Sequence, residues 1–486
     1  MKLTYNIQDK PPFGKTLIFA FQQMIAIMAA TLLVPLITAT YTTPDGGTLL
    51  FDAAAALCGA GFGTIVYILF TKGRSPVFLG SSFTFLGAYS AVIGAGFGYW
   101  GVLIGIAMAG LVYVIMAIII KFVGSAWVNK LLPPVIIGPV VALIGLSLST
   151  TATSWSMTNN GSGYNLLAIV CALVTFLVIV VCSVKGNKTI KLIPFIIGIG
   201  AGYLLALIFT LIGMAANVES MKILSFSSFE SLAPFSITSI FDYPKFTLLE
   251  ACLHPEASNI NWAAIGSIAI IFVPIAVVEL AQHVADHKNL SSIIEKDLIT
   301  DPGLDKTLLG DGVGSIVGGL VGGAANTTYG ESIGCVAITG NASVVSIFVA
   351  ACGCILLSFV SPFVALINSI PKCVMGGACI ALYGFIAVSG LQMLRKVDLN
   401  DNRNLFPVAA IFVCGIGGLV LDFTFGDTTI ELTSLAFAMI LGIVTNLITH
   451  SGKDKDKAHA EGEAVEASST EEAASADEGS SESESK

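Results

Sequence analysis

The feature that most limits how this chain can fold is a succession of apolar runs, each close to the length of a membrane span. A transmembrane helix needs about 20 mostly apolar residues. Of the 486 residues, 55% are hydrophobic and 11% are charged, whereas soluble domains carry about 25% charged residues. The sequence therefore predicts an all-α polytopic membrane protein. The eleven clear candidate spans are Thr16–Ile37, Leu49–Phe70, Gly98–Phe122, Val135–Leu148, Tyr164–Cys182, Leu192–Ile212, Trp262–Ala281, Val344–Leu366, Val374–Leu391, Leu405–Leu421 and Leu432–Thr449.

Three further stretches are shorter or rich in Gly, Ser and Thr, as expected of broken or half-length spans, and they raise the predicted count to fourteen. These stretches are Ser75–Gly94, Thr307–Gly323 and Asn326–Thr339. The positions of Lys and Arg test the count, because these residues concentrate in cytoplasmic loops. With fourteen spans, only Lys222, Lys245 and Lys372 fall outside, which leaves 20 of the 23 on the cytosolic side. We therefore expect a multi-pass protein of the cell membrane with both termini in the cytosol.

The predicted spans fall into two groups of seven, separated by the long segment Ala215–Asn261. Because seven is odd, the second group is inverted relative to the first. The third span of each group is interrupted by small or polar residues, at Gly80-Ser81-Ser82 and at Asn326-Thr327-Thr328. Interrupted segments in corresponding positions of two halves indicate the binding site of a secondary transporter. Glycines that only allow close helix packing would not explain why both irregular spans are third in their half.

Glu331 is the most informative single residue. It follows the interrupted stretch Asn326–Gly330 inside a largely apolar region. A carboxylate at membrane depth is costly and by default marks a substrate or proton pathway. Irregular backbone at that depth is tolerated only where protein buries it or where it lines a cavity. We therefore place Glu331 at the centre of a transport site.

A second group of polar residues ends the eighth predicted span. Glu279, Gln282 and Asp286 are spaced i, i+3 and i+7, so they share one helical face, and His283 is adjacent to that face. The alternative interpretation, a helix emerging into the cytosol, suits His287 and the lysine after it. It suits Glu279 and Gln282 less well, because the apolar run continues around them.

Several motifs resemble the nucleobase–ascorbate transporter family, and the wording Thr-Thr-Tyr-Gly-Glu at 327–331 is similar to that of its uracil permeases. The resemblance extends from about Pro12 to Ile448. The other matching motifs are Ala30-Thr31-Leu32-Leu33-Val34-Pro35, Leu79-Gly80-Ser81-Ser82-Phe83, Lys296-Asp297-Leu298, Asp301-Pro302-Gly303-Leu304, Val374-Met375-Gly376-Gly377 and Leu382-Tyr383-Gly384.

The resemblance implies two inverted seven-segment repeats that form a core domain and a gate domain. Segments 3 and 10 would each contain a short extended strand, and the two strands would cross as an antiparallel pair. The expected boundaries are 1–15 for the cytosolic N-terminus, 16–125 and 262–368 for the core domain, 126–213 and 369–450 for the gate domain, 214–261 for an external loop, and 451–486 for a disordered acidic cytosolic tail.

The activity that the resemblance implies is uracil import coupled to proton symport. By motif match, Phe83 and Gly330 would offer backbone groups to the base and Glu331 would accept from a ring N–H. Ala30, Tyr329 and Tyr383 would line the pocket. Each polar edge of a buried base needs a partner, since an unpaired buried polar group costs about 1–3 kcal/mol.

Two departures from the family pattern concern coupling. Gln282 stands where the family usually carries Glu, and Ser332 replaces the usual Asn. Gln offers a donor and an acceptor, so Gln282 can still contact a base, but it cannot titrate. The proton-coupling candidates are therefore Glu331 and Asp286, with Glu279 as the fallback. The alternatives left open are a xanthine or purine carrier of the same family and an uncoupled nucleobase facilitator.

Other classes fit the sequence less well. An inorganic anion exchanger is disfavoured because a carboxylate at the centre of its site would repel an anion. The sequence shows no nucleophile or metal-ligand arrangement around the acidic residues that would indicate an enzyme. No metal-ligand spacing is evident among the ten cysteines, and we expect no cofactor. The tail accounts for −7 of the net charge of −9, so the body gives no reason to expect nucleic acid as a partner. The expected partners are uracil, protons and the lipid bilayer, and a homodimer stays open.

Overall fold

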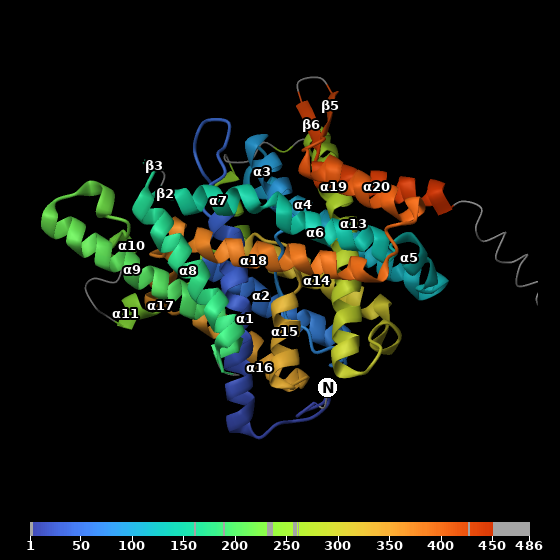
Figure 1. Ribbon diagram of the computed structural model, residues 1–486, viewed down its shortest axis with the longest axis horizontal. Helices are drawn as coiled ribbons and strands as arrows, with labels where there is room; N and C mark the ends of the chain where they lie inside the picture. Colours follow the sequence, from blue (N-terminus) through green and yellow to red (C-terminus); the bar gives the residue numbers. More distant parts are fainter. Residues whose placement is uncertain are drawn as a thin grey trace, which may run out of the picture.

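The computed structural model describes residues 3–159, 162–187, 190–230, 237–255, 260, 262–425 and 428–450. The predicted acidic tail lies outside these residues. The described chain is predominantly helical (Figure 1). Eight of its helices are long and apolar enough to cross a membrane, and three shorter apolar helices accompany them. The predominantly helical, membrane-type architecture is therefore confirmed, whereas the fourteen-segment inverted repeat stays a prediction.

The first half of the chain forms helices wherever the apolar runs predict them. Its elements are α1 (Phe13–Thr38), α2 (Ala53–Phe70), β1 (Leu79–Ser81), α3 (Leu86–Gly94), α4 (Gly98–Val123), α5 (Ala126–Leu131), α6 (Pro134–Ser147), α7 (Ser149–Met157), β2 (Thr158–Asn159), β3 (Ser162–Tyr164), α8 (Leu166–Lys185) and α9 (Pro194–Ala216). Asp52 and Asn165 cap α2 and α8 by accepting hydrogen bonds from free backbone N–H groups of the first turn. The fifth predicted span, Val135–Leu148, corresponds to α6, and α7 begins directly after it.

The second half follows a segment of short helices, α10 (Ser227–Glu230), α11 (Ile237–Ile240) and α12 (Thr247–Leu253). Its elements are α13 (Trp262–Ile294), α14 (Leu304–Gly322), β4 (Asn326–Thr328), α15 (Gly330–Thr339), α16 (Val344–Ser358), α17 (Ser361–Asn368), α18 (Lys372–Met393), α19 (Asn402–Ile416), β5 (Leu421–Phe425), β6 (Thr428–Leu432) and α20 (Ser434–His450). In Figure 1, α8 and α9 lie at one end of the molecule and α19 and α20 at the other.

Both interrupted spans contain a strand followed by a short helix, as expected. β1 and β4 pair antiparallel, with Gly80 opposite Thr327 and Ser81 opposite Asn326. Both strands are fully buried. Irregular backbone deep in the protein thus satisfies part of its hydrogen bonding across the pair. Just before β4, the Ala325 N–H donates a further hydrogen bond of 2.8 Å to the Tyr89 hydroxyl.

Glycines let α2 and α14 approach each other closely behind the strands. A Cβ added at Gly59 would lie 2.6 Å from the Gly318 carbonyl oxygen. The Asn326 side chain fills the space between Gly63 and Gly318 and donates to the Gly59 carbonyl oxygen at 3.0 Å. Asn326 therefore anchors β4 to α2 and α14. The stretch Thr307–Gly323 is rich in glycine because the two helices approach closely and the Asn326 side chain needs room beside them. That stretch is one continuous helix, α14, and the expectation of a broken span there is wrong.

The end of the eighth span also differs from the prediction. The apolar run alone predicts an exit from the membrane near Ala281, but α13 continues to Ile294. His283 and His287 are fully buried. In the sequence, two polar residues at this position suggest that the helix is leaving the membrane. In the structure, neighbouring helices supply hydrogen-bond partners that make their burial favourable. The connection to α14 is correspondingly short.

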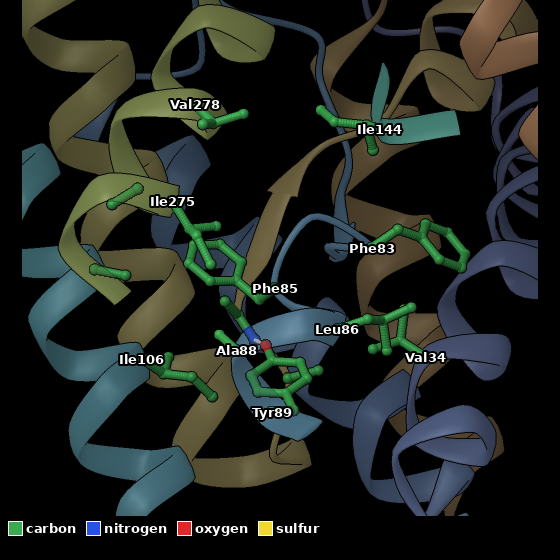
Figure 2. Close-up of a cluster of buried hydrophobic side chains, with 14 of the residues drawn as sticks. Val34, Phe83, Phe85, Leu86, Ala88, Tyr89, Ile106, Ile144, Ile275 and Val278 are labelled. Atoms are coloured by element: carbon green, nitrogen blue, oxygen red, sulfur yellow. Dashed lines mark hydrogen bonds between the residues drawn. The ribbon is translucent and has the colours of Figure 1, made fainter. Parts of the chain in front are cut away.

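The side chains after β1 divide between two environments. Figure 2 shows Phe85 turned toward Ile275 of α13, whereas Phe83 points the opposite way. Phe85 stacks on Phe272 with ring centroids 5.8 Å apart and belongs to the hydrophobic core. Phe83 is thereby directed toward the site described next.

Candidate functional site

A cavity of about 290 Å³ lies at one side of the strand pair. The residues after β1, the middle of α13, the junction of β4 with α15, and α18 each contribute to its wall. Five predicted site residues besides Tyr329 line it, namely Phe83, Gln282, Asp286, Gly330 and Glu331. Segments far apart in the sequence therefore bring the predicted polar residues to one small cavity.

Glu331 occupies the first turn of α15, directly after the strand. The preceding Gly330 is the first residue of that helix, so its N–H is one of the amides that lack an intrahelical partner. Partial positive charge at a helix N-terminus favours a carboxylate there. Glu331 is partly exposed to the cavity. The helix N-terminus therefore stabilises the carboxylate while it stays accessible to a ligand.

Tyr329 lines the cavity and holds the two strands together. Its hydroxyl donates a 2.8 Å hydrogen bond to the Ser81 carbonyl oxygen and lies 3.5 Å from Thr31 Oγ1. Its ring covers Gly80, where an added Cβ would lie only 2.3 Å from a ring carbon. The close approach explains why glycine stands at the centre of β1.

Phe83 presents its ring to the cavity and packs against Tyr383. The two ring centroids are 5.6 Å apart and the planes are at 78°, an edge-to-face contact. Such pairs are favourable because the ring edge is positive and the face negative. Tyr383 is nearly fully buried and supports Phe83 from behind, so the structure does not place it on the cavity wall itself.

Gln282 and Asp286 come from successive turns of α13. Both line the cavity and both are partly exposed. Asp286 accepts a 2.8 Å hydrogen bond from Thr328 Oγ1, which ties α13 to β4. Gln282 offers an amide side chain to a bound molecule, and Asp286 and Glu331 offer carboxylates. These side chains can therefore accept from ring N–H groups and donate to a ring carbonyl.

Two further predicted residues lie away from this cavity. Ala30 is buried within α1. Glu279 is on the far side of the strands, beside a void of about 10 Å³ that Phe85 and Tyr113 also line. Neither Glu279 carboxylate oxygen has a hydrogen-bond partner among the described residues. The helical stripe predicted from sequence therefore divides, with Gln282 and Asp286 in the cavity and Glu279 outside it.

His283 and His287 belong to a buried polar chain next to the site, and their partners were not predicted from the sequence. His283 Nδ1 lies 2.6 Å from Asp311 Oδ2, and its Nε2 lies 3.1 Å from Thr307 Oγ1. His287 Nε2 lies 2.7 Å from the Tyr67 hydroxyl. The signal for Asp311 was present in Gly310-Asp311-Gly312, since an acid in a glycine-rich apolar run needs a buried partner. These contacts hold α13 against α14 and α2.

Comparisons with known proteins identify relatives along most of the chain. A family model described as a permease family matches residues 14–423. The uracil permease of Bacillus caldolyticus is 38% identical over 92% of this chain and 95% of its own length. The uracil permease of Bacillus subtilis (strain 168) is 34% identical, covering 93% of this chain and 97% of that protein. That of Escherichia coli (strain K12) is 31% identical, covering 91% and 93%.

Solved structures show the fold. The transmembrane domain of the cyanobacterial bicarbonate transporter BicA matches with a TM-score of 0.53 at 14% identity, covering 92% of this chain and all of that one. The structure of SLC26A9 matches with a TM-score of 0.56 at 12% identity, covering 89% of this chain and 64% of that one. The family match and the relatives show a multi-pass membrane transporter. The chain belongs to the permease family of the nucleobase–ascorbate transporters.

Proposed function

We propose that this protein imports uracil across the cell membrane together with a proton. The observation that carries the proposal is the cavity in which Glu331, Gln282 and Phe83 meet beside the strand pair. Uracil presents N–H donors and carbonyl acceptors around a flat ring, and these groups supply matching acceptors, a donor and an aromatic face. The uracil permeases among the relatives support the same substrate.

Each residue has a distinct role in this proposal. Glu331 accepts from a ring N–H, Gln282 binds a second polar edge, and the backbone at Phe83 and Gly330 completes the contacts. Asp286 or Glu331 carries the proton, because both line the cavity and Gln282 cannot titrate. Glu279 is the weaker candidate, since it lies outside the cavity.

Transport would require the core helices, α1–α4 and α13–α17, to move against the gate helices, α5–α9 and α18–α20. Helices of both groups line the cavity, since α13 and α15 contribute from one group and α6 and α18 from the other. A site between two such groups is exposed to alternate sides when one group moves against the other. The excess of Lys and Arg in the inner loops supports cytosolic termini.

Uptake of radiolabelled uracil into vesicles, with and without an imposed pH gradient, tests the proposal. We expect uptake that is stimulated by an inward proton gradient and abolished by its collapse. Uptake indifferent to the gradient would favour an uncoupled facilitator. Uptake of radiolabelled xanthine in place of uracil would favour the purine carrier.

A further inference from the structure

A second cavity, of about 370 Å³, adjoins the site cavity and is not used by the function proposed above. The two cavities share three lining residues, Phe195, Glu331 and Phe385. The remaining wall comes from α1, the end of α8, the start of α9 and the body of α15. The second cavity therefore lies between helices of the proposed core and gate domains.

Two aromatic rings stand where the cavities meet. Phe195 is in the first turn of α9 and Phe385 is in the middle of α18. Their ring centroids are 6.2 Å apart with the planes at 70°, an edge-to-face contact. Phe385 is 52% exposed and lines both cavities. A ring with about half of its surface free can change its rotamer at low cost.

Glu331 lies on the wall of both cavities. A base whose ring N–H is bound to this carboxylate can thus pass from the first cavity into the second without losing its acceptor. The continuity matters because a buried donor without a partner is costly. The aromatic pair is then the element that the flat ring has to pass.

The far part of the second cavity is more polar and includes Ser183 and Lys191. Lys191 lies in the connection between α8 and α9, which the distribution of Lys and Arg predicts to be cytosolic. In the cavity wall among the described residues, Lys191 and Glu331 are the charged side chains. The cavity thus runs from the carboxylate toward the predicted cytosolic face.

We propose that the second cavity is the route by which the base leaves the site for the cytosol, and that the Phe195–Phe385 pair is its gate. The inference rests on the proposed function, since it takes uracil as the molecule released. A gate controls rates in both directions and leaves equilibrium affinity largely unchanged, because binding and release pass the same barrier. That property separates a gate from a binding contact.

Release is measured by loading the purified, membrane-reconstituted protein with radiolabelled uracil and chasing with unlabelled uracil. In Phe195→Ala and Phe385→Ala we expect the dissociation rate to rise roughly 3- to 10-fold, with affinity within about 3-fold of the parent. Phe406→Ala on α19 is the control, because Phe406 is 58% exposed and lines neither cavity. Unchanged release in both gate variants overturns the gate alone, whereas no uracil binding by the parent overturns the proposed function as well.

Sidedness is measured with Ile338→Cys on α15, a position 41% exposed in the second cavity. We expect a membrane-impermeant maleimide to label it in inside-out vesicles and to miss it in right-side-out vesicles, above the background of the parent's ten cysteines. Ile208→Cys, 52% exposed on α9 and outside both cavities, is the matched control and should stay unlabelled. Failure to label Ile338→Cys from the cytosolic side, as in a groove filled by lipid, contradicts the route.

Discussion

The Tyr329 hydroxyl donates a 2.8 Å hydrogen bond to the Ser81 carbonyl oxygen and so joins the two halves of the chain beside the cavity. The bond runs from the residue after β4 back to the end of β1, which are themselves paired. The Tyr329 ring covers Gly80 without room for a side chain. The geometry of Glu331, two residues further on, therefore depends on a glycine in the other half of the chain.

Gly80→Ala should destabilise the protein and weaken uracil binding, because the new methyl group would overlap the Tyr329 ring. Overpacking of this kind costs about 1–3 kcal/mol. Thermal unfolding in detergent and a binding assay measure the two effects. Gly94→Ala is the matched control, since nothing lies within 4 Å of its added Cβ. Equal melting temperatures for Gly80→Ala and the parent would contradict the close packing.

Asp286 and Gln282 should have separable effects on coupling. Asp286→Asn should flatten the dependence of uptake on the proton gradient, because the amide keeps a hydrogen bond with Thr328 but cannot titrate. Gln282→Glu should keep uracil recognition and steepen that dependence. Uptake measured over a series of imposed gradients distinguishes the variants. Unchanged dependence in both Asp286→Asn and Glu331→Gln would exclude these residues as proton carriers.

His283 and Asp311 should be energetically coupled. Removing one member of a buried pair leaves the other without a partner and costs about 3–5 kcal/mol. We therefore expect His283→Leu and Asp311→Leu each to lower the apparent unfolding temperature strongly. The decrease in unfolding temperature of the double variant should be smaller than the sum of the two single decreases, because neither member of the pair remains buried without the other. Strictly additive losses would show that the 2.6 Å contact does not contribute.

Asp301, in the connection between α13 and α14, should form a pH-dependent ion pair with the segment that follows α2. Its carboxylate lies 2.8 Å from Lys296 Nζ and 3.1 Å from Arg74. Hydrogen bonds from Lys296 and then Arg74 lower the pKa of Asp301. A lowered folded-state pKa gives a stabilisation that is full above the ordinary Asp pKa of about 3.9 and is lost as pH falls through the folded-state value.

The matching variant is Asp301→Asn. It should unfold at a slightly lower temperature than the parent at pH 7. The difference in unfolding temperature should disappear in acid, once the parent's carboxylate is protonated. Because the three side chains are between 41% and 49% exposed, salt at about 1 M should also narrow this difference. A difference in unfolding temperature that is unchanged in acid, or unchanged in high salt, would contradict an electrostatic contribution from Asp301.

The location of the site was largely predictable, since the interrupted stretches in third position mark the segments that hold β1 and β4, and the family resemblance implied that these segments contain paired strands. The length of α13 was not. From the sequence, His287 is expected to be exposed to solvent at the end of a helix. Its burial is made favourable by a hydrogen bond with Tyr67, which lies on another helix. Phe195 and Phe385 could not be selected either, because nothing local distinguishes two cavity-lining phenylalanines from the others among the 29 in the chain. Which apolar side chain faces a cavity is decided by packing between distant segments.

Calorimetric titration of uracil into the parent and into Glu331→Ala tests most directly the claim that the cavity beside β1 and β4 binds the base through this carboxylate. Hydrogen bonds to charged groups contribute about 1.5–3 kcal/mol, so we predict an affinity at least about 10-fold weaker in Glu331→Ala. Glu219→Ala, at an 82% exposed side chain outside the cavity, should bind like the parent. Affinity in a folded Glu331→Ala equal to that of the parent would contradict the account.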